Sequence, residues 1–307
     1  MDSDEDGAAS RKDEIEDEIM ELEKRLAAAK VRLGKAAASA SPSLPCQSLI
    51  HPVVSHAHPH SPIFHPAPLD SPTHYLLLLS DSQLPIGSFA FSSGLESYLA
   101  HSPRRSTFSS FLPLSLSSFA ATTLPFVLAG HRDPCSLVSL DDQLDAAVVC
   151  AVGRRASVAQ GRALLSIWER SFRKTLCAAK ADLPVLKEFG ALLRDGSAAR
   201  DEVPPVSAHL APLFGVICGV VGLTVQQTAY VYMASHVKAL VSAAVRASMF
   251  GPYQAQQVLA GEEVQTLITR LIAREWNTKV EEAGQSVPVM DLWIGRHEVL
   301  YSRIFNS

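Results

Sequence analysis

Hydrophobic positions in the first part of the chain follow a heptad spacing. Between residues 12 and 35 the apolar positions are separated by four, three, four and seven residues: Ile15, Ile19, Leu22, Leu26 and Leu33, with Ala29 completing the series. Charged residues of both signs fill the positions between them, as on the outer face of a coiled coil. The pattern predicts a coiled-coil helix within an N-terminal leader, residues 1–35. About three heptads are marginal for an isolated helix pair, so a solvated single helix is an equally valid interpretation.

The heptad pattern is lost between residues 36 and 73. Eight prolines and many serines interrupt any regular period there, and Asp70 is the one charged residue. This composition predicts a disordered linker. Five histidines lie in it, and the two-residue spacing of His56, His58 and His60 could bind nickel or zinc. No carboxylate or cysteine is fixed beside them, so these are weak metal candidates, and we expect no metal site in the body of the chain.

From residue 74 to the C-terminus the apolar spacing is helical, and the alternation typical of strands is essentially missing. Ser93 and Glu96 form a predicted capping box that starts a helix near Gly94. Further helices are expected to begin at Ser139 and at Asp291, the latter running into the C-terminus, and to cover residues 154–172, 184–193, 206–224, 225–249 and 262–275. The predicted fold is all-α, a single domain resembling a helical bundle of about nine or ten helices.

Candidate core residues lie on one face of several of these helices. They are Leu140, Leu144, Val148 and Val149, then Ala156, Ala159, Leu164 and Ile167, and finally the stripe Val264, Leu267, Ile268, Leu271 and Ile272. Residues 100–138 are rich in serine and are interrupted by four prolines: Pro103, Pro113, Pro125 and Pro134. The expected core is therefore best defined after residue 138.

Charge and cysteine usage narrow the possible functions. The net charge is −4, and residues 1–35 carry 11 acidic and 7 basic side chains, which accounts for the deficit. From residue 74 onward there are 20 basic and 19 acidic residues, and no basic stripe indicates nucleic-acid binding. Five scattered cysteines and an acidic N-terminus without a hydrophobic stretch indicate reduced thiols in a cytoplasmic protein.

One apolar run raises the question of a membrane. Residues 210–225 contain Gly215 and Gly219 at the spacing that can pair membrane helices. The run is about 16 residues long, whereas a spanning helix needs about 20. A buried helix packed closely through its glycines is the preferred interpretation, and a membrane-associated helical protein is the alternative.

Residues that could carry catalysis are few. The sequence contains no nucleophile elbow, zinc-protease motif or phosphate-binding loop, and the histidines after the linker are isolated. Asp141 and Asp142 are adjacent, so on a helix they point about 100° apart and would not share one substrate. We interpret them as stabilising a helix N-terminus. A non-enzymatic protein is expected, and a helical enzyme with an unrecognised pocket remains the alternative.

The segment from Asp81 to Glu96 is an ordered connection rich in turn residues. It resembles the N-terminal signature of the UreF family of urease accessory proteins through Asp81, Ser82, Leu84, Pro85, Gly87, Phe89, Ser92, Gly94, Leu95 and Glu96. Later positions resemble the same family in the same order: Arg155, Ser157 and Gln160, then Tyr230 and Arg246, and a C-terminal tail with Arg296, His297, Leu300, Tyr301, Arg303 and Phe305. The resemblance covers residues 74–307. It is poor at 100–138, and the family's second glycine is replaced by Ser88.

The resemblance implies an all-α, dimeric scaffold without a permanently bound cofactor. Proteins of this family bind the accessory protein UreD, called UreH in some bacteria, and the pair recruits the GTPase UreG. The assembly delivers nickel to urease apoprotein. The matched positions, apart from Leu84, Leu95 and Leu300, are candidate partner-binding residues, and the leader and linker inherit no role. The aromatic tail, with Trp293, Tyr301, Arg303 and Phe305, is expected to form a helical face that covers either its own body or a partner.

Overall fold

The computed structural model describes residues 71–81, 88–102, 107–176, 184–198 and 204–306. Within these ranges it is all-α and contains no strand, which confirms the predicted fold class. The α-helices are α2 (Pro72–Leu79), α3 (Leu95–His101), α4 (Phe108–Arg132), α5 (Leu137–Ala147), α6 (Ala151–Ile167), α7 (Arg173–Thr175), α9 (Pro184–Ala198), α10 (Leu210–Val220), α11 (Val225–Arg246), α12 (Pro252–Ala260), α13 (Glu262–Glu275) and α14 (Val289–Arg296). Short turns link them: η1 (Ser88–Ala90), η2 (Pro134–Ser136), a π-helical turn η3 (Trp168–Phe172), η4 (Val280–Glu282) and η5 (His297–Val299).

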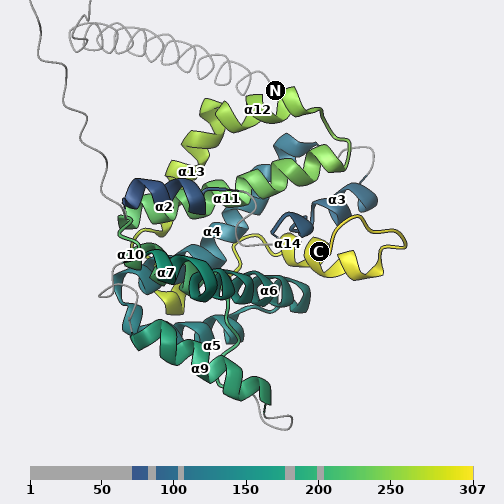
Figure 1. Ribbon diagram of the computed structural model, residues 1–307. Coiled ribbons are helices and arrows are strands. Elements are labelled where there is room, and N and C mark those ends of the chain that lie inside the picture. Colours follow the sequence, from purple (N-terminus) through teal and green to yellow (C-terminus); the bar gives the residue numbers. More distant parts are fainter. Residues whose placement is uncertain (1–70, 82–87, 103–106, 177–183, 199–203, 307) are drawn as a thin grey trace, which may run out of the picture. The chain divides into compact units, whose positions relative to one another are not determined.

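Helix α4 is the central element, and α10 packs along it (Figure 1). A Cβ added to Gly215 would lie 2.1 Å from the carbonyl oxygen of Val127, so the glycine allows the two backbones to meet. From Leu210 to Cys218 every residue of α10 is buried. The prediction of a buried helix packed through its glycines is therefore confirmed.

Helix α4 lies within residues 100–138, where four prolines interrupt the sequence and no helix was predicted. Pro113 and Pro125 lie inside it, and the Thr107 hydroxyl caps its start by accepting the Ser110 N–H at 3.2 Å. Each internal proline weakens a helix by about 3 kcal/mol, and burial of most apolar side chains of α4 offsets that cost. By length and composition α4 could cross a membrane, but 67% of its most apolar window is buried inside the protein.

The remaining helices surround this pair. In Figure 1, α12 and α13 lie at one end, and α5 and α9 lie at the other. The stripe predicted on residues 262–275 is buried at Val264, Leu267, Ile268 and Leu271 of α13. A capping box does occur, at the start of α11, where Thr224 and Gln227 bond each other reciprocally. Helix α12 was not predicted, because its Gly251–Pro252 start and glutamine-rich sequence give a weak apolar period.

Several local predictions were wrong. The capping box at Ser93 does not form: Gly94 is the N-cap of α3, and the Glu96 N–H donates to the Ser92 hydroxyl at 3.4 Å instead. The last α-helix ends at Arg296 and is followed only by the 3₁₀ turn η5, so the α-helical face expected to continue towards the C-terminus does not form. Val149 is 88% exposed because α5 ends two residues earlier, and Ala159 is also exposed. The coiled-coil prediction and all but residues 71–73 of the linker lie outside the described residues.

Candidate functional site

The start of α3 and the last helix lie against each other, which joins the two ends of the sequence signature. Gly94 has φ +86°, a conformation that favours glycine. An added Cβ there would lie 3.1 Å from Cγ1 of Ile294 and 3.3 Å from Cβ of Trp293. The Trp293 ring meets Tyr98 edge-on, with centroids 4.8 Å apart. Thus the partly buried Trp293 packs against the body of the protein, the first of the two arrangements that the sequence left open.

Glu96 binds the C-terminal tail at three points. His297 Nε2–H donates to Oε2 at 2.8 Å, the Ile304 N–H donates to Oε1 at 2.6 Å, and the Phe305 N–H donates to Oε2 at 3.2 Å. The imidazole of His297 is fully buried, and the Glu96 side chain is 12% exposed. Charge-assisted bonds of this kind are stronger than neutral ones. One carboxylate therefore fixes the path of the tail after α14.

Arg246 and η1 hold the end of the tail. The Arg246 guanidinium lies 4.4 Å from the centre of the buried Phe305 ring and donates to the carbonyl oxygen of Phe89. The Asn306 N–H donates to the Ala90 carbonyl at 2.7 Å. Burial lowers the pKa of Arg246, which still carries its charge at neutral pH. These contacts bring together the C-terminal end of α11 and residues from both signature blocks.

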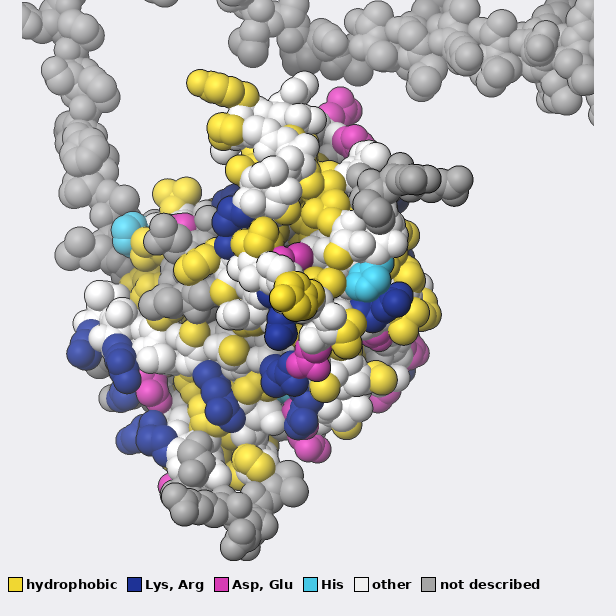
Figure 2. All heavy atoms as spheres, turned by 90° about the vertical axis from the view of Figure 1, so that its right-hand side faces the viewer, with side chains coloured by type: hydrophobic (Ala, Val, Ile, Leu, Met, Phe, Trp, Pro, Cys, Tyr) yellow, Lys and Arg dark blue, Asp and Glu magenta, His cyan; other side chains and the backbone are white. Residues whose placement is uncertain are grey.

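The segment so fixed presents apolar side chains to solvent. Four side chains on α14 and the tail form what we call the tail patch: Leu292 (62% exposed), Val299 (74%), Tyr301 (fully exposed) and Ile304 (63%). Figure 2 shows apolar side chains among Lys and Arg on the face that carries this part of the chain. Arg155 of α6 forms an ion pair with Glu298 at the edge of the patch. Exposed apolar groups on a fixed backbone are typical of protein-binding surfaces.

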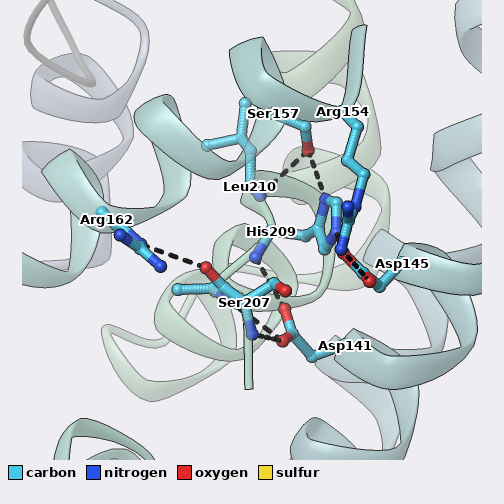
Figure 3. Close-up of polar contacts among 9 residues, drawn as sticks. Asp141, Asp145, Arg154, Ser157, Arg162, Ser207, His209 and Leu210 are labelled. Atoms are coloured by element: carbon cyan, nitrogen blue, oxygen red, sulfur yellow. Dashed lines mark hydrogen bonds and ion pairs between the residues drawn. The ribbon is translucent and has the colours of Figure 1, made fainter. Parts of the chain in front are cut away.

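A second polar network lies around Asp141 (Figure 3). The side chain is fully buried and accepts backbone N–H groups from Ser207 at 2.7 Å, Ala208 at 3.1 Å and His209 at 2.6 Å. Ala208 has φ +68°, which is strained for alanine. A Cβ on Gly161 would lie 2.1 Å from the Ala208 carbonyl oxygen, so α6 needs a glycine where this loop passes. Asp141 thus holds the loop before α10, and the prediction that it stabilises its own helix N-terminus was wrong.

His209 connects this loop to α5 and α6. Its Nε2–H donates to Asp145 Oδ1 at 2.8 Å, and its Nδ1 accepts from the Ser157 hydroxyl at 3.0 Å. Burial raises the pKa of the Asp145 carboxyl, but hydrogen bonds from Arg154 and His209 outweigh this effect and lower it to about 2. Both imidazole nitrogens are occupied by protein groups and the ring is fully buried, so the network orients α10 against α6.

The predicted site residues divide into four groups. Phe89, Gly94, Glu96, Arg246, His297 and Phe305 come together with buried Ser92 beside them, and Arg155 reaches the same segment through Glu298. Arg296, Tyr301 and Arg303 are exposed on or near the tail, while Asp81 is exposed after α2. Ser82, Pro85 and Gly87 lie outside the described residues.

Three predicted residues belong elsewhere. Ser157 bonds His209, and Gln160 donates to the Ala156 carbonyl of its own helix. Tyr230 precedes Arg246 by sixteen positions on α11, so the two lie about 24 Å apart. Sequence reasoning missed Asp145 and His209. The four-residue spacing of Asp141 and Asp145, which places both on one helix face, was the signal that could have indicated them.

No metal site is apparent in the part of the chain that the structure describes, where no group of three or more His, Cys, Asp or Glu side chains could hold an ion. The candidates His56, His58 and His60 lie outside the described residues.

Comparison with known proteins identifies the family. The UreF family model matches residues 104–262. An uncharacterized urease accessory protein UreF-like from Schizosaccharomyces pombe is 35% identical over 237 residues, which cover 76% of this chain and 97% of that protein. The chain belongs to the UreF family. Urease accessory protein F from Oryza sativa subsp. indica is 32% identical and covers 74% of this chain and 82% of its own length, and urease accessory protein UreF from Paenarthrobacter aurescens is 30% identical and covers 77% and 100%.

The UreF family model spans α4 to the start of α13, whereas Glu96 and the tail lie outside it. The alignments with the Schizosaccharomyces pombe and Paenarthrobacter aurescens relatives cover nearly the whole of each relative and a larger part of this chain than the UreF family model matches. UreF-family proteins are accessory proteins and not catalytic enzymes, as predicted.

Proposed function

We propose that this chain is a urease accessory protein that acts as a non-catalytic scaffold. Together with a UreD (UreH) homologue and the GTPase UreG, it promotes the insertion of nickel into urease apoprotein in the cytoplasm. Nickel is cargo of the assembly and has no permanent site on this chain. The observation that carries the proposal is the tail patch, which Glu96 and Arg246 hold on a fixed backbone.

The tail patch is the surface we assign to the UreD homologue. An exposed tyrosine between Val299 and Ile304 supplies the kind of aromatic anchor that dominates protein interfaces. Because Glu96 already orders the tail, little conformational entropy is lost when a partner binds. The names of the rice and bacterial relatives, which are urease accessory proteins, support the accessory role of the chain.

Two alternatives have weaker support. Ser157, His209 and Asp145 have the residue types of a hydrolase relay, but the buried imidazole and the accessory character of the family favour a structural role. A membrane role for residues 210–225 does not fit a helix whose side chains are buried in the protein.

The proposal also includes a homodimer, which binds UreG on a face other than the tail patch. Light scattering of the purified chain tests whether it is a dimer.

Co-purification with the UreD homologue of the same organism tests the proposal. Truncation after Asp291 would also remove Trp293 and Ile294, which pack against Tyr98 and Gly94. A point substitution on the tail patch keeps these contacts, so a loss of binding can be assigned to the patch. We expect Tyr301→Ala to lower UreD binding at least tenfold without changing thermal stability, a loss typical of an interface anchor.

Tyr253→Ala is the matched control, because Tyr253 is 92% exposed on α12, away from the tail. Equal loss in both variants would remove the tail patch from the proposal. Failure of the folded wild-type chain to bind UreD would contradict the accessory role itself.

A further inference from the structure

A cavity of about 250 Å³, partly open to solvent, lies where α4, α6, α11 and α14 meet. One wall is a stack of three rings. The Phe119 ring lies between His236, at 3.8 Å and nearly parallel, and Tyr232, at 4.9 Å with an interplanar angle of 17°. Apolar lining residues from α10 include Leu210 and Phe214. The cavity therefore has an aromatic wall.

The polar groups of this cavity are placed for a neutral molecule. The Ser235 hydroxyl is buried and has no hydrogen-bond partner, although most buried hydroxyls have one. Ser115 Oγ lies 3.1 Å from His236 Nε2, and burial lowers the pKa of His236 to about 3, so that ring is uncharged at neutral pH. Asp291 is the one charged side chain among the described lining residues, and its Oδ1 accepts from Gln285 at 2.9 Å.

The lining chemistry disfavours an anionic ligand. A phosphate or carboxylate entering the cavity would lose its hydration without meeting any Lys or Arg among the described lining residues. A neutral ring loses little hydration and gains stacking contacts. An apolar cavity of about 150 Å³ accommodates benzene, so this larger one has room for about two fused rings.

We propose that this cavity is a binding site for a small, flat, uncharged aromatic molecule with one hydrogen-bonding group. Its ring packs against the wall formed by Phe119, His236 and Tyr232, and its polar group bonds the Ser235 hydroxyl. The proposal does not depend on the accessory role, and it uses none of the residues of the tail patch. Met290 and Ile294 of α14 form part of the lining, so occupancy also supports the helix from which the tail leaves.

Calorimetric titration of the full chain with two matched probes tests this site. We expect 2-naphthol, which is neutral at pH 7, to bind with a stoichiometry of one and to raise Tm. We expect 2-naphthalenesulfonate, which has the same rings and a negative charge, to bind at least tenfold more weakly. Absence of saturable 2-naphthol binding, or equal binding of both probes, would overturn the proposal.

Two variants locate the binding. Ala239→Leu fills the cavity from α11 and should weaken 2-naphthol binding at least tenfold, whereas Ala146→Leu, at an exposed position of α5, should leave it unchanged. Ser235→Ala keeps the cavity open, removes the unpartnered hydroxyl and should weaken binding about fivefold, as loss of one hydrogen bond does. If Ala239→Leu does not fold by circular dichroism, Ser235→Ala decides. Unchanged affinity in the folded cavity variants would place the probe elsewhere and refute the assignment.

Discussion

Two regions of this molecule use the same chemistry for different ends. In each, a carboxylate accepts backbone N–H groups from a distant segment, and a fully buried histidine bonds a carboxylate. Around Asp141 the bound segment is 207–209, with His209 on Asp145, and around Glu96 it is 304–305, with His297 on Glu96 itself. The hydrogen bonds therefore do not distinguish a structural site from a binding site.

The surroundings of the two carboxylates differ. The loop that Asp141 holds leads directly into α10, whose side chains are buried against α4. The tail that Glu96 holds leads into the exposed side chains of Tyr301 and Ile304. A carboxylate clamp that leads into the core stabilises the fold, and one that leads into exposed apolar groups presents a surface.

Substitution of Asp141 should give the largest effect. In Asp141→Ala three backbone N–H groups lose their acceptor, two of them deeply buried, while Ala208 keeps a strained conformation. We expect the free energy of unfolding to fall by about 3–5 kcal/mol, measured by urea denaturation. Asp142→Ala is the control, since its neighbouring carboxylate is exposed and should change stability by less than about 0.5 kcal/mol. Similar values for both variants would show that the clamp does not hold the loop.

The all-α fold could be predicted from the sequence because apolar residues recur at helical spacing over long stretches and the alternation typical of strands is essentially missing. Helix α13 shows this most clearly, since its stripe is buried as predicted. Helix α4 shows the limit, because tertiary burial outweighs the local penalty of Pro113 and Pro125. The end of the last helix at Arg296 was also beyond local reasoning, since the contacts with Glu96, two hundred residues away, determine the path of the tail.

The residues of the candidate site could be predicted from the sequence, but their arrangement in space could not. The resemblance to the UreF family selected Glu96, Arg246, His297 and Phe305, and the structure brings these four together. Periodicity could not show that Phe305 faces inward while Tyr301 faces solvent, because this segment has no regular period. The second network was missed because an isolated histidine such as His209 carries no signal without its partners.

Substitution of Glu96 should give the second largest loss of stability. It tests the carboxylate that holds the tail independently of Asp141, which holds the loop before α10. In Glu96→Gln the side chain keeps its shape but loses its charge, so the bonds to the tail amides weaken. We expect a loss of global stability of about 1–2 kcal/mol, together with hydrogen exchange of the Ile304 and Phe305 amides at least tenfold faster. UreD binding should fall in parallel, because the tail patch is then less ordered. Unchanged exchange at these two amides would mean that other contacts order the tail.

The Asp145 carboxyl should give a smaller effect that depends on pH. Its pKa in the folded protein is about 2, below its usual value of 3.8, so the stabilisation is complete above about pH 4 and is lost as the pH falls towards 2. Arg154 is about half exposed, so solvent screening reduces the contribution to about 1 kcal/mol. The difference in Tm between wild type and Asp145→Ala should therefore shrink between pH 4 and pH 2. A difference that stays constant over this range would assign the effect to packing instead of charge.

The ion pair between Arg155 and Glu298 should have the smallest effect on stability. Both side chains are largely exposed, at 62% and 49%, and surface pairs of this kind contribute less than about 0.5 kcal/mol. We therefore expect Arg155→Ala to leave the urea midpoint unchanged and to leave the Ile304 and Phe305 amides protected, since Glu96 holds them independently. If the same variant exposed those amides to exchange, the tail would be held jointly from α3 and α6, and the clamp at Glu96 would not be sufficient to present the patch.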